Sequence, residues 1–163
     1  GSYAGEIEKQ QFPPGYKSLA ADFAASVRAQ VDRLQNRPAE ALKRLEPILA
    51  ETKNPLESPF VSEAYERFTR AELLYELGRY PEARGGFDHL VESSVFEFVY
   101  LPLSHLWLGE ICDRQGDSKN AAAHYKAFVD LWRDCDRDLS PMVELARHKL
   151  EALTARTAPA STK

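Results

Sequence analysis

Histidine and cysteine side chains come close enough in the sequence to suggest a metal site. His105 and Cys112 are seven residues apart, which places them on one face of a helix, and His124 follows in the next helical segment. Imidazole nitrogens and a thiolate are ligands that zinc prefers. Cys112 also occupies an apolar position of a helical pattern, where a free cysteine behaves as a small hydrophobic residue. We therefore expect Cys112 to pack in a core and the histidines to be solvated or singly hydrogen-bonded, with no metal and no cofactor.

Alternating aspartates at residues 134–138 (DCDRD) resemble the start of a calcium loop. Such a loop needs a glycine and a glutamate further on, where this chain has Leu139 and Leu145. We expect a solvated loop instead. The sequence also contains no glycine-rich phosphate loop, no GxSxG, no HExxH and no CxxC motif. These observations predict a protein that is not an enzyme.

Composition narrows the classes of partner. The chain has 163 residues, of which 44% are hydrophobic, and a net charge of −4, so a nucleic-acid partner is not expected. Cys112 and Cys135 are too few for a disulfide framework and favour a cytoplasmic setting. No apolar stretch is long enough for a membrane span. The chain opens with Gly1-Ser2, which looks like a protease-cleavage scar, so we expect a fragment of a longer protein.

Apolar residues recur at intervals of three and four, the pattern of amphipathic helices, in seven segments: 17–34, 39–52, 61–77, 82–92, 103–114, 119–133 and 142–153. In the first segment these residues are Leu19, Phe23, Val27, Val31 and Leu34. Residues 95–100 (VFEFVY) have strand propensity but no partner, so we expect a packed connector. Gly85-Gly86 is expected to allow close packing against this connector. The predicted fold class is all-α.

Three segments share one pattern of residues: LQNRPAEALKRLEPIL (34–49), LGRYPEARGGFDHLV (77–91) and QGDSKNAAAHYKAFV (115–129). Each has a turn residue at Asn36, Gly78 or Gly116, and an alanine five residues later at Ala41, Ala83 or Ala121. Large apolar residues follow at Leu45 and Ile48, Phe87 and Leu90, and Tyr125 and Phe128. The turn reverses the chain, the alanine lets the two helices approach, and the large residues fill the groove between hairpins.

This pattern, with Leu108-Gly109 ahead of the third copy, resembles the tetratricopeptide repeat; the other copies have Arg70-Ala71 and Arg28-Ala29 at that pair. The resemblance implies a right-handed superhelical stack of three helical hairpins, at about 17–52, 58–94 and 99–134, with a capping helix at 140–154. Together these form a repeat domain over 17–154. Residues 1–16 would be the scar and an N-terminal lead, and 155–163 a disordered tail.

The run YKAFVDLWRDCDRDLSPMVELARHKLEAL is similar to the end of the repeat tails on bacterial serine/threonine kinases and related multidomain signalling regulators. The resemblance implies a C-terminal module of such a protein, which would supply any catalytic domain from outside this chain.

The tetratricopeptide resemblance implies a non-catalytic protein–protein interaction module, or scaffold, that binds a partner segment on its concave face. The first helical segment is expected to contribute Phe23, Ser26, Gln30 and Arg33 to that face. The candidate partner-binding residues on it are Tyr65, Phe68, Glu72, Tyr75, Glu76, Leu103, Leu106, Glu110 and Asp113. Aromatic groups beside carboxylates suit a partner with apolar and basic residues. Members that bind a C-terminal carboxylate use basic residues on this face, whereas this chain has none at Ser26, Gln30, Thr69, Leu103 and Trp107.

Two other functions stay open at the sequence level. Trp107 and the connector at 95–100 add apolar surface that three repeats would not cover, which favours a homodimer through that region. The second alternative is a small helical enzyme or ligand-binding domain.

Overall fold

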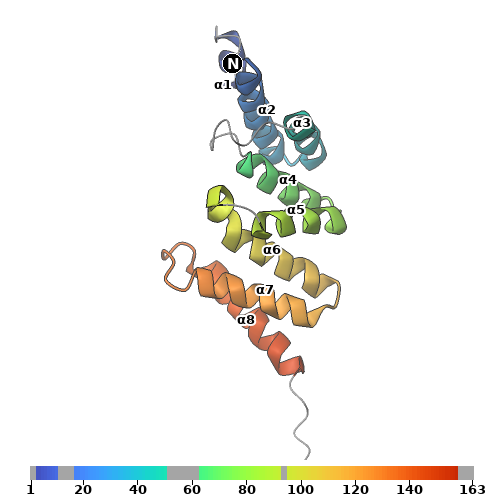
Figure 1. Ribbon diagram of the computed structural model, residues 1–163, viewed down its shortest axis with the longest axis vertical. Helices are drawn as coiled ribbons and strands as arrows, with labels where there is room; N and C mark the ends of the chain where they lie inside the picture. Colours follow the sequence, from blue (N-terminus) through green and yellow to red (C-terminus); the bar gives the residue numbers. More distant parts are fainter. Residues whose placement is uncertain (1–2, 11–16, 51–62, 93–94, 158–163) are drawn as a thin grey trace, which may run out of the picture. The chain divides into compact units, whose positions relative to one another are not determined.

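The computed structural model describes residues 3–10, 17–50, 63–92 and 95–157, and all elements in these ranges are helical (Figure 1). They are α1 (Tyr3–Lys9), α2 (Lys17–Leu34), α3 (Pro38–Ala50), α4 (Ala64–Glu76), α5 (Tyr80–Glu92), the 3₁₀ helix η3 (Val95–Tyr100), α6 (Leu101–Arg114), α7 (Ser118–Leu131) and α8 (Ser140–Thr157). The predicted all-α class is confirmed. None of the described helices has the length and hydropathy that a membrane span requires.

The seven predicted helical segments correspond to α2–α8, with ends that differ by a few residues. Three features differ from the prediction. Helix α1 lies within the expected N-terminal lead. The connector at 95–100 is a 3₁₀ helix that exposes Phe98 and Val99, so the expectation of a packed connector is wrong for these two residues. Helix α8 continues to Thr157, so the first part of the expected disordered tail is helical, while 158–163 lie outside the described residues.

The chain divides into two compact units, Gly1–Ala83 and Arg84–Lys163, where the sequence suggests one continuous repeat domain. In the first unit, α1 packs against α2, α2 against α3, and α3 against α4. In the second unit, η3 packs against α6, α6 against α7, and α7 against α8. Helices α2–α3 and α6–α7 therefore form two of the predicted hairpins, one in each unit.

The three predicted turn residues share one backbone geometry. Asn36, Gly78 and Gly116 have φ values of 57°, 74° and 77°, the left-handed region that glycine and asparagine tolerate best. After each turn, an N–H donates to the carbonyl five residues earlier at 2.9 Å, in the pairs Arg37–Asp32, Arg79–Leu74 and Asp117–Cys112. This is the hydrogen bond of a Schellman motif, and its threefold recurrence confirms that the turns are equivalent.

The predicted packing positions after each turn form the core. All nine side chains are at most 2% exposed: Ala41, Leu45, Ile48, Ala83, Phe87, Leu90, Ala121, Tyr125 and Phe128. The second residue of the Leu-Gly pair has equally little room. A Cβ on Gly109 would lie 2.8 Å from the ring of Tyr125, and the corresponding Ala29 and Ala71 are fully buried. Only the smallest side chains occupy this position.

Helix α2 packs differently from its apolar pattern. Phe23, Val27, Val31 and Leu34 are 53%, 37%, 42% and 87% exposed. The helix instead buries smaller or polar side chains: Ala20, Ala24, Ser26, Ala29 and Asp32. The small residues let the neighbouring helices approach, so the apolar row that the sequence pattern would place in a core is on the surface.

Gly85 in α5 does not serve close packing. Among the described residues, no atom outside its own helical backbone and chain neighbours lies within 4 Å of the position that a Cβ would take. The expectation of tight packing against the connector is therefore wrong for this residue. Gly85 is an exposed glycine inside a helix, where its backbone freedom lowers helix stability.

Candidate functional site

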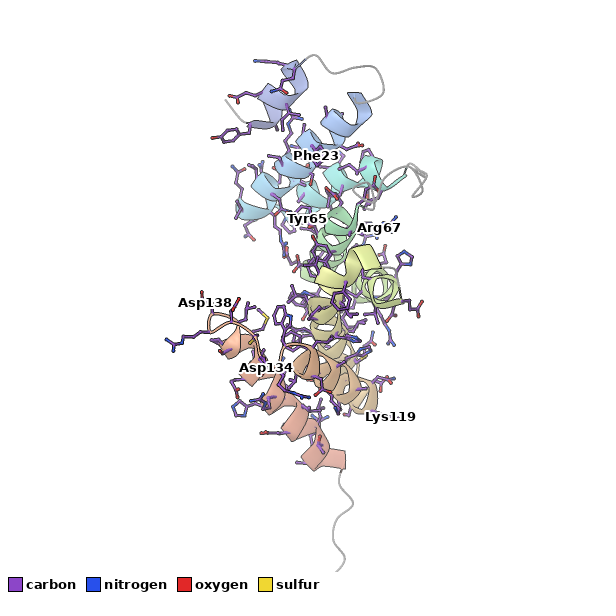
Figure 2. All side chains as sticks on the ribbon, turned by 60° about the vertical axis from the view of Figure 1, so that its left-hand side comes forward. Phe23, Tyr65, Arg67, Lys119, Asp134 and Asp138 are labelled. Atoms are coloured by element: carbon purple, nitrogen blue, oxygen red, sulfur yellow. The ribbon has the colours of Figure 1, made fainter. Side chains whose placement is uncertain are left out.

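Five of the nine expected partner-binding residues lie on α4, in the first unit. Tyr65, Glu72 and Glu76 are seven and four residues apart, so they share one face of the helix. Figure 2 shows Tyr65 on α4 and Phe23 on α2. Tyr65 is 42% exposed and Phe23 is 53% exposed. Both helices therefore present an aromatic side chain to solvent.

The carboxylates of this face bind an arginine from α2. Arg33 donates from Nη1 to Glu72 Oε2 at 2.7 Å, and from Nη2 and Nε to Glu76 Oε1 at 2.6 and 3.0 Å. The Glu72 side chain is 15% exposed and that of Arg33 is 28% exposed. The guanidinium therefore connects α2 to α4 in a partly buried ion cluster, which we call the Arg33 cluster (Arg33, Glu72 and Glu76).

The surroundings of Arg33 and Tyr65 raise the pKa values of both residues. Burial by itself lowers the pKa of Arg33, but hydrogen bonds to Glu72 and Glu76 outweigh it, so the net pKa is raised. Burial raises the pKa of Tyr65, and a hydrogen bond with Thr69 partly opposes that shift. Arg33 stays charged and Tyr65 stays neutral at physiological pH. The exposed part of this face is thus an aromatic ring beside two carboxylates whose negative charge one internal cation compensates only in part.

The other two α4 residues have structural contacts. Phe68 is only 5% exposed and belongs to the core. Tyr75 is half-buried, and its ring packs edge-on against Tyr80 with centroids 5.3 Å apart. Of the five α4 residues, Tyr65 therefore has the most accessible apolar surface.

The remaining four residues lie on α6, in the second unit, close to the capping helix α8. Glu110 accepts a hydrogen bond from Lys149 Nζ of α8. Leu103 and Leu106 pack against a core cluster to which α8 contributes Val143, Ala146 and Leu153. Asp113 is half-exposed at the end of α6. Helix α8 therefore covers part of the α6 surface.

The sequence pattern places Arg33 on the same expected face as Glu72 and Glu76 but does not pair them, and it does not pair Lys149 with Glu110. Arg33 is 39 and 43 residues from Glu72 and Glu76, and Lys149 is 39 residues from Glu110. These separations are close to the interval between successive turns. Oppositely charged residues about one repeat length apart in the sequence are therefore the signal that could have identified these ion pairs. The assignment of all nine residues to partner binding stays a prediction.

Only two of the three candidate metal ligands lie close together. His105 and His124 face each other with 3.1 Å between their Nδ1 atoms. Cys112 is fully buried, and burial raises the pKa of its thiol. Within the described ranges, no three His, Cys, Asp or Glu side chains are grouped as a metal site would require.

The aspartates at 134–138 lie in the segment between α7 and α8, where Figure 2 shows Asp134 and Asp138. Asp134, Asp136 and Asp138 are all exposed. This agrees with the predicted solvated loop. Leu139 occupies the position where a calcium loop needs glycine, and unlike the aspartates it is half-buried.

Comparison with known proteins identifies one family. The model of the tetratricopeptide repeat matches residues 67–85, from within α4, across the turn at Gly78, into α5. Searches of the curated proteins and of the solved structures gave no significant match. The match supports a tetratricopeptide repeat in this chain, as its residue pattern predicted.

Proposed function

We propose that this chain, which carries a tetratricopeptide repeat, is a non-catalytic module that binds a protein segment through the α4 face and the adjoining Arg33 cluster. Tetratricopeptide repeats in general mediate protein–protein interaction and are not enzymes. The observation that carries the proposal is the exposed ring of Tyr65 beside the Arg33 cluster. Exposed aromatic residues are typical anchors of protein interfaces.

The Arg33 cluster suggests which partner chemistry this face favours. Glu72 and Glu76 carry two negative charges against the single positive charge of Arg33, so a basic partner residue would meet a net charge of −1, and a closer contact would need an exchange with Arg33. Such an exchange gains little net free energy. We therefore propose that an apolar side chain of the partner packs on Tyr65 and supplies most of the affinity. Basic partner residues would mainly set orientation.

The surface row on α2 adds to this proposal. Phe23, Val27, Val31 and Leu34 are all more than a third exposed. Contiguous exposed apolar residues commonly mark interaction sites. We propose that the partner segment extends from Tyr65 onto this row. The α6 residues Leu103, Leu106, Glu110 and Asp113 remain a proposed second contact region.

Peptides from a random library displayed on phage test the binding proposal without a known partner. Peptides selected on the intact chain are synthesised with a fluorophore, and their affinities are measured by fluorescence anisotropy. Tyr65→Ala should weaken binding about tenfold or more, because it removes an aromatic anchor. Tyr3→Ala is the matched control, since Tyr3 is an exposed tyrosine of α1 in the same unit.

The outcomes of this experiment separate the hypotheses. Peptides that lose affinity with Tyr65→Ala and keep it with Tyr3→Ala support the proposal. Peptides that bind both variants as tightly as the original chain place the binding site elsewhere. Failure to select any peptide at micromolar affinity also contradicts the proposed function.

Self-association is the second candidate function, and one observation favours it. Phe98 and Val99 of η3 are 66% and 70% exposed. Trp107 of α6 stacks on Phe87 of the same unit, with ring centroids 6.3 Å apart. Exposed apolar residues on a short helix suit an interface between two copies. Light scattering over a concentration series tests this: a dimer that Phe98→Ser with Val99→Ser converts to monomer supports it, and a strict monomer contradicts it.

We also propose that the chain is part of a larger cytoplasmic signalling or regulatory protein of bacteria. The similarity of residues 125–153 to the tails of bacterial serine/threonine kinases supports this. The complete gene provides the test. A kinase or another regulatory domain in the same reading frame is expected, and a reading frame without any further domain would contradict the proposal.

A further inference from the structure

Two histidines face each other across the α6–α7 hairpin. The Nδ1 atoms of His105 and His124 are 3.1 Å apart, and both rings are half-buried. Their ring centroids are 5.4 Å apart, which is the Nδ1–Nδ1 distance plus about one ring radius at each end. Each Nδ1 atom therefore points straight at the other. This is the geometry of an N–H···N hydrogen bond.

The hydrogen bond fixes the protonation of the two rings. In a neutral pair one Nδ1 carries the proton and donates it, so the other Nδ1 must be the bare acceptor. The donor ring is then the Nδ1–H tautomer and the acceptor ring is the Nε2–H tautomer. Two imidazoles that bind one metal ion would instead incline toward a common point beside the line that joins them. The geometry therefore favours a shared proton over a shared metal.

We propose that the His105–His124 pair is a pH-sensitive connection between α6 and α7, held by one shared proton and broken when both rings are protonated. With one proton added, an imidazolium still donates to the neutral ring. With two protons added, both Nδ1 atoms are donors, and two positive charges face each other at hydrogen-bond distance. The hairpin then loses its only bond between these side chains and gains a repulsion.

The surrounding charges are few and partly cancel. Burial lowers the pKa of His105 below its usual value, and the charge of His124 lowers it further. Burial also lowers the pKa of His124, while Asp88 and Asp117 raise it and Arg84 lowers it. Arg84 and Asp88 lie in α5 and form an ion pair, at 3.5 Å, and Asp117 precedes α7. The carboxylates therefore do not compensate a doubly charged pair.

The direction of the pH effect follows from these lowered pKa values. Below about pH 6.5, the unfolded chain binds protons that the folded pair resists. Stability from this pair is therefore complete above that pH and decreases as the pH falls through and below it. Acidification thus loosens the α6–α7 hairpin of the second unit. This inference does not depend on the proposed partner binding.

Nuclear magnetic resonance of the intact chain tests the shared proton directly. Long-range ¹H–¹⁵N spectra at pH 7.5 should show one of the two rings as the Nδ1–H tautomer and the other as the Nε2–H tautomer. On acidification the two rings should titrate together in two steps, the second below about pH 6.5, where an unperturbed imidazole titrates. Two Nε2–H rings at pH 7.5, or independent single-step titration of each ring at about pH 6.5, would overturn the proposal.

Thermal unfolding between pH 7.5 and 5.0 tests the effect on stability. His105→Gln and His124→Gln each keep a hydrogen-bonding side chain that cannot titrate, so the decrease of Tm with acidification should become smaller. The matched controls are His89→Gln and His148→Gln, which replace exposed histidines and should keep the original decrease. An unchanged decrease in both pair variants would contradict the proposal. If either pair variant fails to fold, the spectra of the unmodified chain decide.

Discussion

Gly109 of α6 lies directly against the ring of Tyr125 of α7. A Cβ at this position would come within 2.8 Å of Cδ1 and Cε1 of that ring. Tyr125 is fully buried, so its ring cannot move toward solvent. The pair therefore sets how closely the two helices of this hairpin approach, and it explains why the residue pattern of the repeat requires glycine or alanine here.

The contact predicts a cost for Gly109→Ala. The added methyl group should lower the free energy of unfolding by about 1–3 kcal/mol through overpacking, less the gain of up to about 1 kcal/mol in helix propensity. Urea unfolding followed by circular dichroism measures this. Combining the change with Tyr125→Leu, which removes the ring, should cost less than the sum of the two single changes. Strict additivity would show that the contact is unimportant.

Two glycines predict opposite effects for the same substitution. Gly78 has a φ of +74°, so Gly78→Ala should destabilise the chain by about 1 kcal/mol. Gly85 is exposed inside α5 with nothing near the position of a Cβ, so Gly85→Ala should stabilise it by about 0.5–1 kcal/mol. Thermal unfolding of both variants measures the difference. Equal effects of the same sign would contradict the assigned backbone geometries.

The ion pair between Arg33 and Glu72 predicts a measurable coupling. A double-mutant cycle with Arg33→Gln and Glu72→Gln should give about 1 kcal/mol, because both side chains are partly buried. The control cycle uses Arg79→Gln and Glu82→Gln, an exposed pair three residues apart, which should give a clearly smaller coupling because solvent screens the two charges. A coupling in the first cycle no larger than in the control would mean that the Arg33–Glu72 ion pair does not stabilise the packing of α2 against α4.

The buried carboxylate of Asp32 predicts a specific acid sensitivity. Its hydrogen bond with Arg44 is the main cause that lowers its pKa; burial opposes this, and Arg37 adds to the lowering. Stability from this group is therefore complete above about pH 4 and is lost as the pH falls below it. Asp32→Asn should cost about 1–3 kcal/mol at pH 7 and flatten the decrease of Tm below pH 4.

The control for this prediction is Asp136→Asn, in the exposed segment before α8. It should leave unchanged both the Tm at pH 7 and the decrease of Tm below pH 4. An Asp32→Asn variant whose Tm decreases below pH 4 as in the original chain would show that another carboxylate controls acid unfolding.

Local sequence patterns predict the parts of the fold in which a particular backbone geometry accepts only a few residue types. Asn36, Gly78 and Gly116 were identified as turns because few residues accept a positive φ. The buried positions after each turn followed from the spacing of alanine and large apolar residues. Helix α2 shows where this reasoning fails: its alanines form the packed side, and the larger Phe23 and Leu34 are exposed. Periodicity locates an apolar row but does not show what covers it.

The candidate site was less predictable for a physical reason. The sequence pattern assigns Glu72, Glu76 and Glu110 to helices, but the cations that pair with them come from other helices. Such pairs depend on how helices pack, which a single helical pattern does not contain. The hydrogen bond between His105 and His124 also depends on how α6 packs against α7, so the sequence groups the two residues as possible metal ligands without predicting that bond.

Hydrogen–deuterium exchange with a selected peptide bound tests the proposed binding face most directly. The account predicts that the peptide slows exchange in α2 (Lys17–Leu34) and α4 (Ala64–Glu76), where the exposed apolar row and Tyr65 lie. The Tyr65→Ala variant, under the same conditions, should show little slowing. Protection confined to η3 and α6, with α2 and α4 unchanged, would contradict the account and assign binding to another surface of the chain.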